Sequence, residues 1–148
     1  MYEINNETCA LIAQNASTTE VIEEKRTFII NAPLSQILKE SCEYYGSTLE
    51  GRIKGSKKQL GMCYKLPITI EGSNDIIFFP TTSYENENCC WLSLKHIKEY
   101  TEYDNNTLVT FLNNEKRVFQ LSLPSLENQL FRATKLLLIS RRRRNSEI

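Results

Sequence analysis

In Asn31–Gly46, NAPLSQILKESCEYYG, the apolar periodicity of the chain changes from that of strands to that of a helix, which indicates a mixed α and β fold. Asn31 or Ala32 stands at the cap position, Pro33 suits the first turn, and Gly46 can end the helix. A helix is therefore predicted over residues 33–45. Its apolar face carries Leu34, Ile37, Leu38, Cys42 and Tyr45.

Short strands are predicted on both sides of this helix. Runs rich in apolar and β-branched residues, separated by polar or glycine-containing turns, are typical of antiparallel strands. Asn113-Asn114 suits the positive φ of a tight hairpin. The predicted strands are residues 8–14, 25–31, 66–71, 76–80, 89–94, 107–112 and 116–123.

A second helix is predicted to begin at Pro124-Ser125 and to extend to about residue 140. The fold class is therefore α+β, with one or more antiparallel sheets of short strands and two main helices, about 33–45 and 125–140. The 148 residues contain no repeat or linker, so residues 1–140 are expected to form a single domain. The apolar face of the second helix carries Leu126, Leu130, Ala133, Thr134, Leu137 and Leu138.

Positive charge is gathered locally, although the formal net charge is zero, with 18 Lys plus Arg against 18 Asp plus Glu. Between Glu50 and Glu71 there are five cations and no acid, interspersed with three glycines. This segment is expected to be a flexible loop that either binds a polyanion or only solubilises the surface, and its composition does not decide between the two. Its cations are Arg52, Lys54, Lys57, Lys58 and Lys65.

The C-terminal residues 141–148 begin with four arginines and have too little apolar content to pack. They are expected to form a mobile basic tail. The arginines can act as a basic arm on a nucleic acid, or favour the end of the preceding helix through its dipole, and both effects can operate together.

Catalytic and metal chemistry is not indicated. His96 is the single histidine, and no motif pairs it with a nucleophile and a carboxylate, so the chain is not expected to be an enzyme. The five cysteines lack metal-ligand spacing and are expected to be free thiols, with no metal or cofactor. The order of residues 51–58 does not match a P-loop. No membrane-length apolar run or signal pattern is present, so a cytoplasmic location without a membrane partner is expected.

Several segments, in sequence order from about residue 30 to 135, resemble the ComK-type competence transcription factors of Gram-positive bacteria. The first is Ser41-Cys42-Glu43-Tyr44-Tyr45-Gly46-Ser47 with Gly51-Arg52 and Gly55. The others are Lys65-Leu66-Pro67-Ile68, Ile76-Ile77-Phe78-Phe79-Pro80-Thr81, Cys89-Cys90-Trp91-Leu92-Ser93, His96-Ile97-Lys98-Glu99-Tyr100 and Ser125-Leu126-Glu127-Asn128-Gln129-Leu130-Phe131-Arg132-Ala133-Thr134.

The resemblance implies an activator of DNA-uptake genes that binds paired A/T-rich promoter boxes, mainly from the minor groove, and assembles as a homo-oligomer on double-stranded DNA. Contact with the transcription machinery is a further expectation. Arginine and lysine suit the narrow, negative minor groove of A-tracts. Arg52 and Lys54 are the leading candidates for contacts there, and phosphate contacts are expected from Lys57, Lys58, Lys95 and Lys98. A basic arm is expected from Arg141, Arg142, Arg143 and Arg144.

Two alternatives remain open at this point. The first is a non-enzymatic protein-protein interaction module whose acidic segment, Glu71–Glu87, docks onto a basic partner or a neighbouring copy. The second follows from the longer relatives of the family, which continue beyond the point where this sequence ends. The chain is then a short member, or an inactive truncated paralogue.

Overall fold

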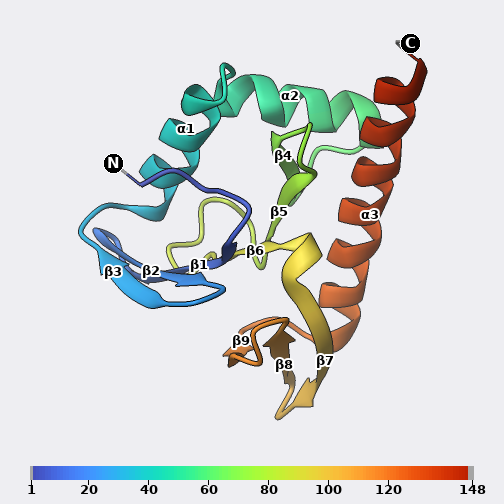
Figure 1. The fold of residues 1–148 in the computed structure, drawn as a ribbon. Helices are drawn as coiled ribbons and strands as arrows, with labels where there is room; N and C mark the ends of the chain where they lie inside the picture. The colour runs from blue at the N-terminus through green and yellow to red at the C-terminus, as the bar shows by residue number, and fades with distance from the viewer. Residues whose placement is uncertain (1, 147–148) are drawn as a thin grey trace.

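A computed structural model describes residues 2–146 and places two antiparallel sheets against three helices (Figure 1). The predicted α+β class is confirmed. The larger sheet has the strand order β3-β2-β1-β6-β5-β4, and the smaller has the order β7-β8-β9. The strands of the larger sheet are β1 (Thr8–Asn15), β2 (Thr18–Glu23), β3 (Thr27–Ile30), β4 (Ile68–Glu71), β5 (Ile76–Pro80) and β6 (Trp91–Ser93). The remaining elements are β7 (Ile97–Tyr103), β8 (Asn106–Phe111), β9 (Lys116–Phe119), α1 (Leu34–Tyr44), α2 (Leu49–Leu60), α3 (Leu123–Ser146) and the short 3-10 turn η1 (Leu94–His96).

The centre of the larger sheet is buried on both faces, and this explains why the sequence of β5 is continuously apolar. Side chains alternate along a strand, so Ile76 and Phe78 face one cluster with α1, whereas Ile77 and Phe79 face another with α3 and the smaller sheet. Both clusters contain completely buried side chains. The run Ile76–Pro80 therefore matches the pattern of a strand covered on both sides.

The expectation of a flexible basic loop after α1 is wrong, because residues 49–60 form the helix α2. Thr48 caps its N-terminus by accepting a hydrogen bond from the Gly51 amide at 2.9 Å, and Gly61 ends it with a left-handed φ of 68°. Two glycines inside a helix each cost roughly 1 kcal/mol relative to alanine, which is why composition favoured a loop. The caps and the packing of Leu60 and Ile53 outweigh that cost.

The C-terminal arginines also differ from the expectation of a mobile tail. The helix α3 continues through Ser146, so residues 141–146 are helical, whereas Glu147 and Ile148 lie outside the described residues. The buried face of α3 includes Leu136 rather than the predicted Leu138, whose side chain is exposed. The expected strand over residues 116–123 ends at Phe119, where the chain turns with the Leu121 amide donating to the Phe119 carbonyl at 2.9 Å, and α3 begins at Leu123.

Two strands were missed by the sequence analysis. No strand was predicted between residues 14 and 25, yet β2 begins at Thr18, and the buried Thr19 hydroxyl donates a hydrogen bond to the Ala32 carbonyl at 2.9 Å. The strand β7 is rich in charge and only one face of it packs, so its apolar signal was weak. His96 precedes β7 in η1 and does not lie on a strand face.

Candidate functional site: a basic corner between α2 and α3

The helix α2 has an inner face that packs against the core and an outer face that is exposed. Ile53 and Leu60 pack into the core, and Ser56 is buried with them. The outer face carries Lys54, Lys57 and Lys58, all exposed and spaced at i, i+3 and i+4. A helix therefore holds these ammonium groups on one surface more firmly than the expected loop would have done.

Arg52 differs from these lysines. Its side chain is only partly exposed, and its Nε is buried without a hydrogen-bond partner among the described residues. Burial raises the pKa of Cys42 in α1 to about 11, and the nearby charge of Arg52 offsets part of that shift. Arg52 thus lies against α1 rather than projecting freely into solvent, and its predicted DNA contact stays a prediction.

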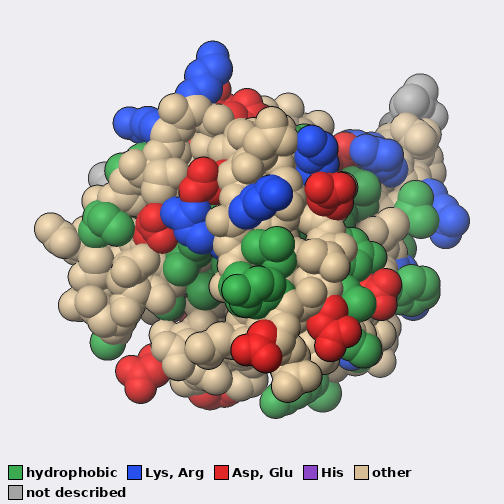
Figure 2. Space-filling model, turned by 90° about the horizontal axis from the view of Figure 1, so that it is seen from below, with side chains coloured by type: hydrophobic (Ala, Val, Ile, Leu, Met, Phe, Trp, Pro, Cys, Tyr) green, Lys and Arg blue, Asp and Glu red, His purple; other side chains and the backbone are tan. Residues whose placement is uncertain are grey.

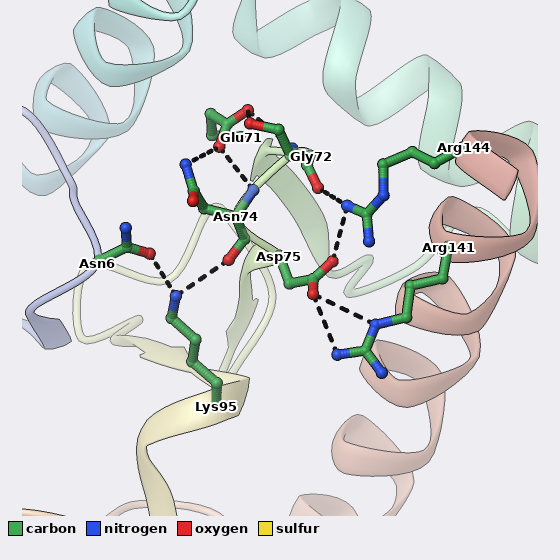
Figure 3. A network of polar contacts seen from close by, with 9 residues as sticks. Asn6, Glu71, Gly72, Asn74, Asp75, Lys95, Arg141 and Arg144 are labelled. Carbon is green, nitrogen blue, oxygen red and sulfur yellow. Dashed lines mark hydrogen bonds and ion pairs between the residues drawn. The ribbon is translucent and has the colours of Figure 1, made fainter. Parts of the chain in front are cut away.

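The arginines at the end of α3 divide into two pairs. Arg141 and Arg144 bind Asp75 in the β4–β5 turn, with N–O distances of 3.1 and 3.0 Å (Figure 3). Arg144 also donates to the Gly72 carbonyl. Burial alone would raise the pKa of Asp75, but hydrogen bonds and charge from Arg144 and Arg141 hold it below its ordinary value. These two arginines hold the last turns of α3 against the sheet.

Arg142 and Arg143 form the second pair. Both are exposed, and neither has an ion-pair partner among residues 2–146. The C-terminal end of α2 lies beside the C-terminal half of α3 (Figure 1), and the two helices are in contact. This basic corner combines five exposed cations from segments far apart in sequence: Lys54, Lys57, Lys58, Arg142 and Arg143.

The two remaining predicted cations lie elsewhere. Lys95 donates hydrogen bonds to the Asn6 side chain and to the Asn74 carbonyl, on the β4–β5 turn that also holds the α3 arginines (Figure 3). Lys98 donates to Asn114 at 2.9 Å, in the β8–β9 turn. The structure therefore brings Lys95 near Arg141 and Arg144 and leaves Lys98 apart.

The face of the molecule opposite α2 carries a mixture of charges. Figure 2 shows acidic and basic side chains interspersed there, with apolar side chains between them. The larger sheet and the β7–β9 sheet thus present mixed charge on this side. The basic corner, by contrast, gathers five exposed cations, and the one acid within α2 is Glu50, one turn before Lys54.

Comparison with known proteins assigns the chain to a family. Residues 1–145 match the family model described as ComK protein. The chain belongs to the ComK family. One relative in that family is the competence transcription factor of Bacillus subtilis (strain 168), which is 35% identical over 136 residues. The match covers 88% of this chain and 70% of the relative, and no solved structure matches.

Most segments that carry the ComK resemblance turn out to be structural. The Gln129 amide is buried and donates to the Lys65 and Pro80 carbonyls at 3.0 and 2.8 Å, which joins α3 to β5 and to the chain before β4. The Phe78-Phe79 pair and Trp91 are core residues. Gln129, the Phe78-Phe79 pair and Trp91 therefore serve packing, whereas Tyr44 and Phe131 in other ComK-like segments are exposed.

The hydrogen-bonded cluster of Ser93, His96 and Glu24 was not predicted from the sequence. The Ser93 Oγ lies 2.7 Å from His96 Nδ1, and His96 Nε2 lies 3.1 Å from Glu24 Oε1. Because a carboxylate only accepts, Nε2 carries the proton and Nδ1 accepts from the Ser93 hydroxyl. Burial lowers the pKa of His96, and Glu24 offsets only part of that shift. Ser93 is completely buried, so no substrate reaches it, and the three residues join β6 to the end of β2.

Residues 2–146 contain no group of three or more His, Cys, Asp or Glu side chains placed to hold a metal ion. Four of the five cysteines are buried, Cys63 is exposed, and all are free. None of the helices in this part of the chain is long and apolar enough to cross a membrane.

Proposed function

We propose that this ComK-family chain is a transcriptional activator of competence genes that binds A/T-rich duplex DNA through the basic corner. The observation that carries the proposal is the outer face of α2, where three lysines lie at helical spacing beside the arginine-bearing end of α3. The chain has no net charge, so this local concentration of cations supplies the attraction for a phosphate backbone. The relationship to a competence transcription factor supports the biological role.

The dimensions of DNA favour side chains over the helix itself as the reader of the minor groove. A helix with its side chains is about 10–12 Å across, and the B-form minor groove is about 6 Å wide. Under this proposal α2 lies across the groove, and lysine side chains reach in where A/T pairs narrow it and deepen its negative potential. Lys54 is the leading candidate for that role, with Lys57 and Lys58 on phosphates.

The other predicted contacts fit around this surface. Arg142 and Arg143 extend the basic corner along the duplex, and Lys95, Arg141 and Arg144 lie at the neighbouring β4–β5 turn. Arg52 would need to leave its partly buried position to touch DNA. Lys98 is the contact least supported by the geometry. Assembly of several copies on a promoter, and contact with the transcription machinery, complete the proposal.

The proposal is tested by comparing two double lysine-to-alanine variants, one within the basic corner and one outside it. Lys57→Ala with Lys58→Ala removes two cations from the basic corner, and Lys25→Ala with Lys116→Ala removes two exposed lysines from the β2–β3 turn and from β9. Affinity for a fluorescent A/T-rich duplex is titrated at several salt concentrations. The first variant should bind more weakly, with a salt slope shallower by about 1.8, because each lost phosphate contact removes about 0.9. Equal effects of both variants would contradict the assignment.

A further inference from the structure

A cavity of about 270 Å³ lies on the α1 side of the larger sheet. Its floor and walls are apolar and come from α1, the start of α2, β6 and the β5–β6 connection. Trp91 and Cys89 are nearly buried beneath it, and Tyr84 stacks against Trp91 with ring centroids 5.2 Å apart. The larger apolar side chains that line it are Leu34, Leu38, Leu49, Ile53, Tyr84 and Trp91.

The rim of the cavity is acidic. Glu85 and Glu87 are exposed on the loop above it, and neither carboxylate has an ion-pair partner among the described residues. The Tyr84 hydroxyl fixes the loop by donating to the Leu66 carbonyl at 2.6 Å. Ligand pockets usually measure about 300–1,000 Å³. This smaller cavity is suited to one large apolar side chain with a positive charge next to it.

A surface with the complementary chemistry occurs on α3 of the same chain. Phe131 is 71% exposed and Leu138 is 46% exposed. Lys135 lies one turn after Phe131 on the same helix face, and it is exposed as well. Residues 128–146 contain no acid. Apolar and basic side chains lie next to each other along the edge of the molecule where α3 runs (Figures 1 and 2).

We propose that the cavity binds α3 of a second copy of this chain, with Phe131 inserted as the anchor. Lys135 of that copy then pairs with Glu85 and Glu87 at the rim, and Leu138 covers the edge of the cavity. A single buried aromatic anchor surrounded by weaker contacts is the usual arrangement of a binding hot spot. The rim and the helix have opposite charge, which fixes the orientation of the partner.

The two surfaces lie on opposite sides of the molecule, since the cavity is beside α1 and α3 forms the far edge (Figure 1). One pair of copies therefore cannot exchange both contacts, and the association is head to tail. An interface built on one anchor and two charge pairs falls below the area of a stable dimer, so association is weak and depends on concentration. The outer face of α2 is not part of this contact.

The test is sedimentation velocity without DNA, so it is independent of the proposed function. The wild-type chain should form species larger than a monomer as its concentration rises. Phe131→Ser should weaken association at least tenfold, and so should Glu85→Lys with Glu87→Lys. The matched controls are Tyr103→Ser, an exposed aromatic residue on β7, and Glu99→Lys with Glu102→Lys on the same strand. Circular dichroism establishes that each variant is folded.

The decisive step is to mix the two damaged chains. The Phe131→Ser chain keeps an intact cavity, and the Glu85→Lys, Glu87→Lys chain keeps an intact α3. The mixture should form a one-to-one pair and no larger species, because each chain then has only one working surface. A mixture that stays monomeric, a wild-type chain that stays monomeric at every concentration, or a Phe131→Ser chain that associates normally would overturn the proposal.

Discussion

Asp75→Asn tests the contact that holds the end of α3 against the sheet. Asp75 has a positive φ of 56°, a conformation that asparagine adopts readily, so the substitution removes the charge and keeps the turn. Its carboxylate binds two guanidinium groups that are 52% and 38% exposed, so each pair contributes about 0.2–1 kcal/mol. A loss of about 1 kcal/mol is expected in the free energy of unfolding, or about 2–4 °C in Tm.

The measurement is thermal unfolding in low and high salt, together with amide hydrogen exchange. The difference from wild type should shrink in 1 M salt, where charges are screened beyond about 3 Å. Exchange should rise in residues 141–146 and stay unchanged in β5. Asp104→Asn is the matched control, because Asp104 also has a positive φ and is exposed without an ion-pair partner in the described part of the chain. Identical stability and identical exchange in the Asp75 and wild-type chains would refute the role of this contact.

The same variant has a functional consequence. Asp75 competes with a phosphate for Arg141 and Arg144, so its neutralisation should leave both arginines free to contact DNA. Under the proposed function, affinity for a duplex should rise and the salt slope should steepen by up to about 1.8. Lower affinity would show that the anchored position of α3 matters more than the freed charge.

Three further outcomes are expected. Gly55→Ala should stabilise the protein by up to about 1 kcal/mol, because an added Cβ meets open space. Gly51→Ala should destabilise it, because its Cβ would lie 2.9 Å from the Oγ1 of the capping residue Thr48. Urea denaturation of both variants measures the two changes in the free energy of unfolding. Gln129→Leu removes the hydrogen-bond donor to the buried carbonyl of Pro80 and to the partly buried carbonyl of Lys65, and should cost roughly 1–3 kcal/mol by the same assay. The pKa of His96 is lowered in the folded state, so the unfolded chain takes up a proton at higher pH than the folded chain does. The free energy of unfolding should therefore fall as the pH drops below about 6.5. In a His96→Gln variant, the urea midpoint should change less between pH 8 and pH 5.

The elements whose pattern is local were predictable from the sequence. The apolar face of α1 lies at helical spacing, and residues 76–80 form a strand with the predicted bounds. The hairpin at Asn113-Asn114 is present, and Asn114 has a φ of 70°. In each of these cases one short segment carries both the periodicity and the turn residue.

The missed features depend on contacts between distant segments. The helix α2 contains two glycines, and it forms because its inner face packs on β4 and α3. The last turn of α3 is held by Asp75, 66 residues before Arg141. The charge cluster was found in the sequence because its lysines are close together, but only the fold shows that α3 brings arginines to the same corner.

Under the proposed function, lysines of the basic corner reach into the minor groove of A/T-rich DNA. Duplexes in which inosine-cytosine pairs replace every A/T pair separate the two grooves, because inosine lacks the guanine N2 amino group and leaves the minor groove like that of an A/T pair, while the major groove is like that of a G/C pair. We predict that such a duplex binds as tightly as the A/T-rich parent and that the matching guanine-cytosine duplex binds at least tenfold more weakly. If the inosine duplex binds as weakly as the guanine duplex, or all three bind equally, these lysines do not read the minor groove of A/T pairs.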